Sequence, residues 1–332
     1  MDPYKKDLPL WRSLLFVPTN VRAYVEKAHT RGADGIILDL EDSVPLAEKA
    51  NARGMVAEAA KLVSRNGADV LVRVNEPLEL CVRDLETVVS PDICALLLPK
   101  IDSASHVRLL AALVDRIEAE KGMPIGHTKF SVLVETASAF ARVEEIAMAH
   151  PRIVAVGLGS EDFALDTGGL PDPDVLLYPK QRVAIAARAA GVLPMGIIGT
   201  VADFNDEEGY RKVVRNSRRF GFAGASCIHP KVVSMLNDGF GPTADEVAAA
   251  KRVVEGFEAA KAQGRQDDRL SHRRPRRTPA GAGGADRCEG EADLTSRRPG
   301  SSTAPPACRV GPLTCPDIAS TLRAQKRRRT PV

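Results

Sequence analysis

Eight short runs rich in Val, Ile and Leu recur along the first part of this 332-residue chain, separated by amphipathic stretches. Because each run is continuously apolar rather than alternating, it suits a parallel strand that is covered on both faces. Eight strand–helix units in ~250 residues match the size of a (β/α)8 barrel better than that of an open, doubly wound sheet. The sequence therefore predicts an α/β fold of the (β/α)8 TIM-barrel type, with strands at residues 13–18, 35–42, 70–75, 95–100, 130–136, 153–162, 195–200 and 225–230.

The segments between these runs have helical periodicity, most clearly at residues 20–32, 46–64 and 104–122. No GxGxxG or GxxxxGK[ST] motif follows a strand. This absence removes the usual dinucleotide-binding and P-loop functions from consideration.

The composition changes at residue 265. From there to residue 332 the chain has no Phe, Tyr or Trp and is rich in Arg, Pro, Gly and Ser. Such a segment cannot bury enough apolar surface to offset the entropy of ordering, so we expect a barrel domain at 1–264 and a disordered tail at 265–332. A solvated tail is the favoured interpretation of its Arg clusters. Translation of a shifted reading frame is an alternative that the coding DNA would decide.

Charge and cysteine content narrow the class of protein. The net charge is only +3, and the positive excess is concentrated in the tail, so neither a nucleic-acid surface nor nucleic-acid partners are expected. No apolar run approaches the ~20 residues that span a bilayer, so no membrane association is expected. The six cysteines form no CxxC pair, which suggests reduced thiols and a cytoplasmic protein.

Polar residues follow several predicted strands where the chain leaves the core. In a parallel barrel all carboxyl ends of the strands lie on one face, where the loops build the active site. For any one such residue, departure from the core is an equally good explanation. The recurrence of acids with an Arg and a Lys favours a site, and the set is Asp39, Glu41, Asp42, Arg73, Asn75, Lys100, Glu135, Glu161, Asp162 and His229.

These carboxylates suggest a divalent cation. Mg²⁺ prefers oxygen ligands and commonly takes one or two protein carboxylates together with waters and substrate oxygens. Glu135 and Asp162, at the ends of adjacent predicted strands, would supply that pair, and Glu41 and Asp42 would bind its waters. Arg73 would lie opposite the metal, where it suits a carboxylate or an enolate oxygen. A salt bridge from Arg73 to the same acids is the alternative, and both can hold.

No side chain has the surroundings of an activated nucleophile. Ser160 lacks the GxSxG pattern and a following helix-start pattern. Cys227 is flanked by apolar residues and is expected to be a buried core thiol. A structural role is favoured over a general base for His229. Metal-assisted chemistry is therefore favoured over covalent catalysis, and the absence of paired Cys and His ligands disfavours zinc.

Several motifs also occur together, in order, in one known family. They are RSLLFVP, GADGIILDLEDSVPLAEKANAR, VRVN, LPK, VLVETA, GSEDFALD and FGFAGASCIHPKVVSMLNDGFGPTADEVAAAKRVVEGFEAA. Over residues 11–264 the chain resembles the HpcH/HpaI aldolase superfamily, specifically the citrate lyase beta-subunit-like CoA ester lyases. The resemblance implies a (β/α)8 barrel that assembles as a homotrimer or hexamer. It also implies cleavage or formation of a 3-hydroxyacyl-CoA, such as malyl-CoA, citramalyl-CoA or citryl-CoA, with acetyl-CoA and a 2-oxo acid as the other side of the reaction.

The resemblance also implies roles for individual residues. Glu135 of ETA and Asp162 of SED match the Mg²⁺ ligands, and Glu135 is also expected beside the substrate. Arg73 of VRVN matches the contact to substrate and enolate, and Glu41 and Asp42 of LED match acids that support the metal site and the catalysis. The implied reaction is a retro-Claisen cleavage, in which a base takes the proton of the 3-hydroxyl group and the C–C bond breaks.

Two features depart from the family pattern. Phe16 and Lys27 match positions that contact the CoA ester, but an Arg is usual where this chain has Val21, and Arg22 is one position away. The DGKMID-like lid segment of many relatives has no counterpart after KAQG, where Asp267 and Asp268 are the nearby acids. We therefore predict weak or altered lyase activity.

Two alternative functions stay open. One is a class II aldolase that acts on a free hydroxy-keto acid without CoA. The other is a catalytically impaired subunit that binds acyl groups or 2-oxo acids. The sequence does not name the 2-oxo acid, because glyoxylate, pyruvate and oxaloacetate differ only in a small group that pocket shape must discriminate.

Overall fold

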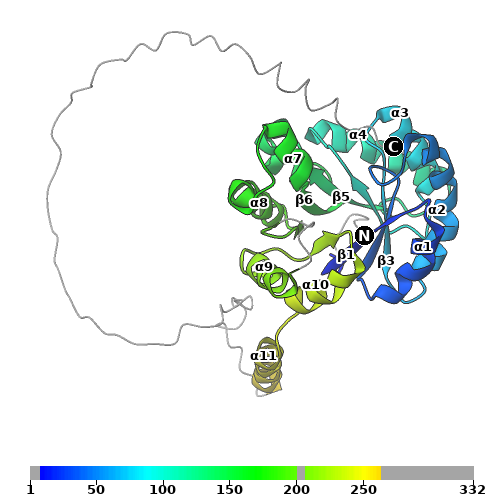
Figure 1. The fold of residues 1–332 in the computed structure, drawn as a ribbon. Coiled ribbons are helices and arrows are strands. Elements are labelled where there is room, and N and C mark those ends of the chain that lie inside the picture. The colour runs from blue at the N-terminus through cyan, green and yellow to red at the C-terminus, as the bar shows by residue number, and fades with distance from the viewer. Residues whose placement is uncertain (1–7, 200–205, 263–332) are drawn as a thin grey trace, which may run out of the picture. The chain divides into compact units, whose positions relative to one another are not determined.

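The computed structural model describes residues 8–199 and 206–262, in which eight parallel strands form one sheet (Figure 1). Its strand order is β7-β6-β5-β4-β3-β2-β1-β8. The strands are β1 (Ser13–Pro18), β2 (Gly35–Asp39), β3 (Asp69–Arg73), β4 (Ala95–Leu98), β5 (Lys129–Val134), β6 (Ile153–Leu158), β7 (Leu193–Met195) and β8 (Ala225–Cys227).

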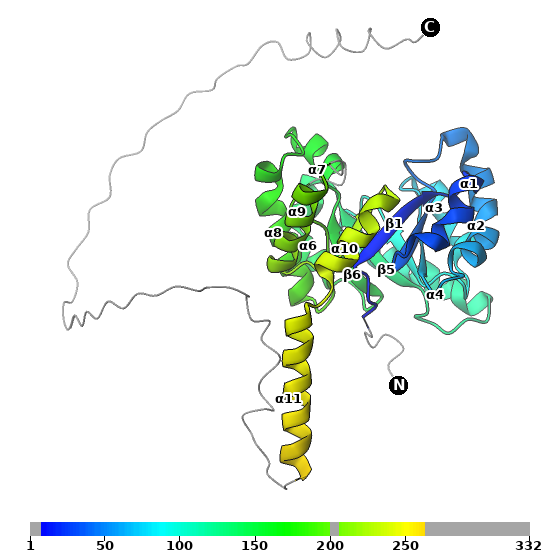
Figure 2. The same ribbon diagram turned by 60° about the horizontal axis from the view of Figure 1, so that its bottom comes forward.

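Helices alternate with the strands, and most of them cover the outside of the sheet, as Figures 1 and 2 show. The α-helices are α1 (Arg22–Ala28), α2 (Lys49–Val63), α3 (Leu78–Val88), α4 (Ala104–Glu120), α5 (Ala137–Ala141), α6 (Val143–Ala147), α7 (Ser160–Thr167), α8 (Pro173–Ala189), α9 (Glu207–Arg219), α10 (Val233–Phe240) and α11 (Ala244–Ala262). Short 3-10 turns are η1 (His29–Arg31), η2 (Leu46–Glu48) and η3 (Pro230–Val232).

The sheet curls into a nearly closed ring. Strand β1 pairs with both β2 and β8, so only the seam between β7 and β8 lacks a full ladder. A single bridge between Met195 and Gly224 joins that seam, and the Gly196 N–H donates to the Gly224 carbonyl at 2.8 Å. The predicted (β/α)8 barrel is confirmed.

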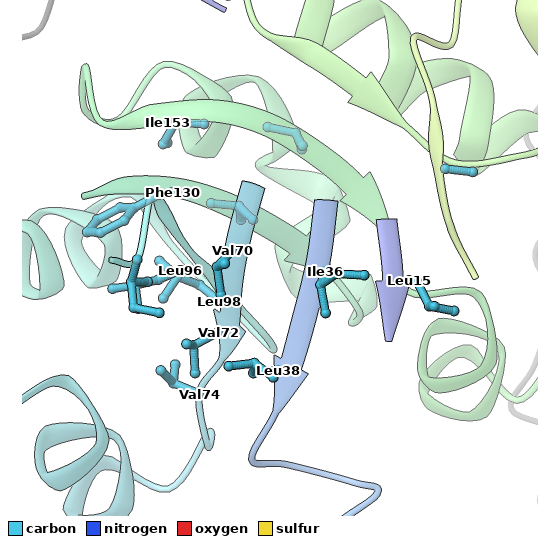
Figure 3. Packing of buried hydrophobic residues seen from close by; sticks show 14 of the residues in the cluster. Leu15, Ile36, Leu38, Val70, Val72, Val74, Leu96, Leu98, Phe130 and Ile153 are labelled. Carbon is cyan, nitrogen blue, oxygen red and sulfur yellow. The ribbon is translucent and has the colours of Figure 1, made fainter. Parts of the chain in front are cut away.

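Two apolar layers explain why the strands are continuously apolar. One layer fills the barrel interior and includes Leu14, Ile37 and Leu71. Alternate residues face outward and pack with apolar side chains of the helices, and Figure 3 shows this second layer. Because successive side chains of a strand point to opposite faces, each strand must be apolar on both. The outward layer includes Leu15, Ile36, Leu38, Val70, Val72, Leu96, Leu98, Phe130 and Ile153.

Most of the predicted strands extend too far at their carboxyl ends. The predicted strand 153–162 ends at Leu158 instead and is followed by helix α7 from Ser160. The expectation that no helix begins after Ser160 was therefore wrong. The prediction of 195–200 was also displaced, since β7 is Leu193–Met195 and includes Pro194. Residues beyond the strand ends, such as Glu135 after β5 and Gly159 after β6, leave the ladder and belong to the loops of the barrel mouth.

A buried ion network lies at the opposite, amino-terminal side of the strands. Arg152 is fully buried just before β6 and contacts the carboxylates of Asp115 and Glu118 in α4. The Glu118 carboxylate also accepts hydrogen bonds at 2.7 Å from the backbone N–H groups of Gly126 and Thr128. Burial alone would raise the pKa of Glu118, but Arg152 and these N–H groups lower it below its ordinary value. The network therefore joins α4 and the following loop to the start of β6.

Within the described ranges, no helix combines the length and the apolar character needed to cross a bilayer. The predictions for residues 265–332, including disorder and the positions of Asp267 and Asp268, lie outside the described residues, so the domain boundary at 264 stays a prediction.

We predict that Glu118→Ala lowers the free energy of unfolding by about 3–5 kcal/mol, because it leaves the buried Arg152 charge with only part of its compensation. Urea denaturation of the purified protein measures this change. The control is Glu120→Ala, which removes the exposed partner of Arg116 and should cost about 0.5 kcal/mol or less. Similar losses for the two variants would contradict a structural role for the network.

Candidate active site at the barrel mouth

Successive side chains of a strand point alternately into and out of the barrel. This alternation places four side chains at the carboxyl end of the barrel interior. Phe16, Asp39, Arg73 and Glu135 each lie two positions after a residue that packs in the interior layer. Asp39 and Arg73 are direct partners in the ladder between β2 and β3. The barrel thus brings together residues that are more than 100 positions apart in the chain.

Arg73 is held by three acids, one at the end of β2 and two in the loop that follows it. Its Nε and Nη2 donate to the two carboxylate oxygens of Asp39, each at 2.6 Å. Its Nη1 lies 2.9 Å from Asp42 Oδ2 and 3.1 Å from Glu41 Oε2. The guanidinium also lies over the Phe16 ring, 4.8 Å from its centroid. Because a guanidinium has five N–H donors, at least one stays available to a ligand.

These contacts also keep the Arg73 guanidinium protonated. Burial by itself would lower the pKa of Arg73, but the Asp39 contact and the neighbouring acids raise it above its ordinary value. The salt bridge that the sequence left as an alternative for Arg73 is therefore present. It fixes the guanidinium plane before any ligand arrives, and such preorganisation is what an electrostatic catalytic group requires.

Asp39 is the main residue of this cluster to which the sequence analysis assigned no role. It is buried, and its carboxylate also accepts from the Glu41 N–H at 3.0 Å. Burial would raise the pKa of Asp39, but Arg73 and the other donors lower it. The available signal was the strand register, because Asp39 and Arg73 end adjacent parallel strands.

Glu135 follows β5 and is only 3% exposed. Its Oε2 accepts the backbone N–H of Lys100 at 2.6 Å. Burial and the nearby charge of Asp162 together raise the pKa of Glu135 to about 7, although Lys100 and Arg73 oppose the shift. Glu135 and Asp162 are thus close enough to interact, as expected for two ligands of one cation.

Lys100 links Glu135 to the Arg73 cluster. Its Nζ lies 3.5 Å from Glu41 Oε1, and burial raises the pKa of Glu41 to about 7 although Arg73 and Lys100 oppose this. The backbone φ of Lys100 is +47°, and it is the one non-glycine residue with positive φ in ranges 8–199 and 206–262. Such a conformation costs about 1–3 kcal/mol in a residue with a Cβ, and it aims the Lys100 N–H at Glu135.

Asp162 lies in the first turn of helix α7, which corrects its predicted place at a strand end. Asp162 is half-buried and Glu161 is exposed. The amino-terminal end of a helix favours carboxylates, because its free N–H groups carry partial positive charge. The helix start therefore holds Asp162 beside the mouth and leaves Glu161 toward solvent.

Gly159 makes room for the Glu135 carboxyl group. A Cβ placed on Gly159 would lie 2.4 Å from Glu135 Oε1, far inside contact distance. The carboxyl group therefore occupies the space that any other residue would fill between β6 and α7. Asp162 follows three positions later.

The donor set at this point fits a hard divalent cation. Glu135 and Asp162 offer oxygen atoms, and Mg²⁺ commonly uses one or two carboxylates with waters and substrate oxygens. In the part of the chain that the structure describes, no group of three or more His, Cys, Asp or Glu side chains is arranged to hold a metal ion. An ion here would depend on waters or a substrate to complete its coordination.

The residues expected to contact a CoA ester lie in different places. Phe16 lies in the mouth beneath Arg73. Lys27 is exposed in the last turn of α1 and takes part in none of the mouth contacts described above. Arg22 begins α1 and pairs with Glu26 at 2.8 Å. The structure therefore brings Phe16, but not Lys27, to the Arg73 cluster.

The remaining polar residues have structural positions. Cys227 is 1% exposed within the outer apolar layer, as predicted for a core thiol. His229 Nδ1 accepts the Lys231 N–H at 3.1 Å at the start of η3, which agrees with a structural histidine.

We predict that Lys100→Gly unfolds with a free energy about 1 kcal/mol higher than Lys100→Met does. Both variants lose the ammonium group, but only Gly adopts φ of +47° without strain. Urea denaturation measures the difference. Lys27 lies in helix α1 and serves as the control position. There Lys27→Gly should unfold with a lower free energy than Lys27→Met, because Gly is the poorer helix former. The same order at both positions would contradict strain at Lys100.

Comparison with known proteins agrees with this architecture. Residues 12–230 match the family model described as HpcH/HpaI aldolase/citrate lyase. Citrate lyase subunit beta of Leuconostoc mesenteroides subsp. cremoris is 36% identical over 258 residues, which are 77% of this chain and 85% of the relative. The L-malyl-CoA/beta-methylmalyl-CoA lyase of Cereibacter sphaeroides is 35% identical over 278 residues, covering 76% of this chain and 86% of the relative.

Solved structures show the same similarity. A citrate lyase beta subunit of M. tuberculosis, complexed with oxaloacetate and magnesium, has a TM-score of 0.57 and 27% identity, covering 73% of this chain and all (100%) of that one. The CitE protein of M. tuberculosis, in complex with magnesium, acetoacetate and coenzyme A, has a TM-score of 0.58 and 27% identity, covering 76% and 88%. The barrel, the carboxylates at its mouth and these matches together show that the chain belongs to the HpcH/HpaI aldolase/citrate lyase family and is an enzyme of the lyase class.

Proposed function

We propose that this chain is a Mg²⁺-dependent carbon–carbon lyase that cleaves or forms a 3-hydroxyacyl-CoA ester, with acetyl-CoA and a 2-oxo acid as the cleavage products. The observation that carries the proposal is the convergence of Glu135, Asp162 and Arg73 at one barrel mouth. It is supported by relatives named citrate lyase subunit beta and L-malyl-CoA/beta-methylmalyl-CoA lyase, and by a similar structure that contains magnesium and coenzyme A.

Glu135 and Asp162 would hold the cation. When bound, Mg²⁺ supplies a Lewis acid that neutralises charge on the 2-oxo acid portion of the substrate. Lys100 keeps one oxygen of Glu135 engaged through its backbone N–H, so the carboxylate orientation is set before binding. Gly159 leaves the space in which that carboxylate lies.

Arg73 would hold the other fragment. Cleavage leaves a negative charge on the acetyl-CoA enolate, and an arginine whose position is fixed can stabilise it without reorganisation. Asp39 holds two of the Arg73 nitrogens from the side of β2, while Glu41 and Asp42 share a third. Glu41 and Asp42 would also bind waters of the cation, and Phe16 and Lys27 would contact the CoA ester.

Two alternatives make different predictions. A class II aldolase would act on a free hydroxy-keto acid and would not bind CoA. An impaired binding subunit would bind Mg²⁺ and a 2-oxo acid but release no acetyl-CoA. The presence of both Arg73 and the two candidate Mg²⁺ ligands favours the lyase, because both fragments of the cleavage need charge compensation. A homotrimer or hexamer and a cytoplasmic location are part of the proposal.

Asp162 and Glu161 should differ in cation binding. Asp162→Ala is expected to weaken Mg²⁺ binding at least ~10-fold, since even loss of a group that only supports a ligand costs about that much. Glu161→Ala, the matched control one position earlier, should bind Mg²⁺ nearly as the unaltered protein does. Isothermal titration with MgCl₂ measures both. Full Mg²⁺ affinity in Asp162→Ala would overturn the assignment of Asp162.

Acetyl-CoA release tests the reaction itself. With Mg²⁺, the purified full-length protein should release acetyl-CoA from at least one of malyl-CoA, citramalyl-CoA and citryl-CoA, and EDTA should abolish the release. Turnover should be slow because the lid motif is missing, and Arg73→Ala should lower kcat about 10²–10³-fold. Release from none of the three would reject the lyase, whereas robust turnover of malyl-CoA would contradict only the predicted weakness.

A further inference from the structure

Lys180 is a buried cation without a buried anion beside it. Its side chain projects from α8, the residue is 4% exposed, and its Nζ donates to the Gly199 carbonyl. No carboxylate in the described ranges lies within ion-pair distance of that Nζ, although Glu161 is near enough to act on its charge. Burial lowers the pKa of Lys180 to about 8, and Glu161 opposes that shift. The buried Arg152, by contrast, has two carboxylate partners.

Burial of an ammonium group costs free energy unless hydrogen bonds or an opposite charge compensate it. An ammonium group has three N–H donors, and a backbone carbonyl accepts only one of them here. Removing a charge from water without an ionic partner costs several kcal/mol. A lysine that is buried without an ionic partner is often functional, because a bound ligand supplies the partner.

Lys180 also lines a cavity of ≈ 60 Å³ between the carboxyl ends of β6, β7 and β8. On this measure a water needs about 10–15 Å³, so the cavity can hold several waters or a group of carboxylate size. The hydroxyl-bearing Ser160 and Ser226 line it as well, together with glycines and the apolar residues Leu133, Leu158, Val183, Met195, Ile197 and Phe222.

Glycines form part of the cavity wall beside the barrel seam. Gly157 and Gly196 line it, and a Cβ on Gly157 would lie 2.9 Å from the Met195 carbonyl oxygen. The neighbouring seam has only the bridge between Met195 and Gly224. Gly157 and Gly196 therefore contribute no side chains to this part of the cavity, which Lys180 reaches from α8.

The cavity borders the candidate cation site. Ser160, in its wall, directly follows Gly159, which abuts the Glu135 carboxyl group, and precedes Asp162 by two positions. Leu133, also in its wall, lies two positions before Glu135 on the same face of β5. A small acid bound at Glu135 and Asp162 would therefore lie next to the cavity.

We propose that this cavity is an anion subsite, in which Lys180 receives a carboxylate carried by the arm of the 2-oxo acid that points away from the cation. The inference rests on the proposed function and deepens it, since it names a 2-oxo acid with a second carboxylate as the preferred substrate. Such an acid would supply the anion that the buried ammonium lacks. Pyruvate and glyoxylate would leave the charge uncompensated, and sites with an unmatched buried polar group discriminate strongly.

The test compares oxaloacetate with pyruvate by isothermal titration in the presence of Mg²⁺. The unaltered protein should bind oxaloacetate at least ~10-fold more tightly than pyruvate. Lys180→Met should reduce that preference to less than about threefold by weakening oxaloacetate binding, with pyruvate binding unchanged. The control is Lys121→Met, which removes a lysine that also donates to backbone carbonyls but lies away from the mouth. Lys121→Met should retain the preference.

A second variant covers the case in which Lys180→Met does not fold. Ser226→Asp would place a carboxylate in the cavity wall, where it would occupy the subsite and pair with Lys180. This variant should lose the oxaloacetate preference and keep pyruvate binding. Thermal unfolding of each variant establishes that it is folded before titration.

The outcomes separate the two proposals. Equal binding of the two acids by the unaltered protein would overturn the subsite and leave the lyase standing. Equal weakening of both acids by Lys180→Met would overturn it too, since that is what a simple tether to Gly199 predicts. If neither acid bound in the presence of Mg²⁺, the proposed function and the subsite that rests on it would both be rejected.

Discussion

The alternation of side chains along parallel strands in a ring is the constraint on which the rest of this structure depends. It separates an interior apolar layer from one that faces the helices, and it orients the last inward residue of each strand toward the mouth. In β2 and β3 those last residues are Asp39 and Arg73, which the register places side by side. Their bidentate ion pair therefore follows from the register in which β2 and β3 pair.

Buried charges are compensated to different extents at the two ends of the barrel. At the amino-terminal side, Arg152 and Glu118 compensate each other and satisfy nearby backbone groups, so that end is closed and structural. At the mouth, burial raises the pKa of both Glu41 and Glu135 to about 7 although Arg73 and Lys100 lie near. The charges of the acids at the mouth are thus incompletely compensated, which is consistent with the proposed cation site.

Glycine is the second determinant of the mouth. At Gly159 the absent Cβ admits the Glu135 carboxyl group, and at Gly157 it allows the Met195 carbonyl oxygen to lie close to the backbone. The space at Gly159 orients a candidate metal ligand, and Gly157 lines the cavity that Lys180 also lines. A non-glycine residue at φ +47°, Lys100, completes the arrangement by directing its N–H to Glu135. The site is therefore shaped by backbone geometry as much as by its charged side chains.

Local patterns were sufficient to predict the barrel, because hydrophobic runs and polar strand ends follow from nearest neighbours in the chain. The same patterns selected Arg73, Glu135 and Asp162, whose functional roles stay proposals. Those patterns could not separate the end of β6 from the start of α7, so Asp162 was placed on the wrong element. The Asp39 partnership, the left-handed backbone of Lys100 and the burial of Lys180 were decided by the tertiary structure. Each depends on register, backbone dihedrals or packing between segments well separated in the chain, and no single stretch of sequence contains that information.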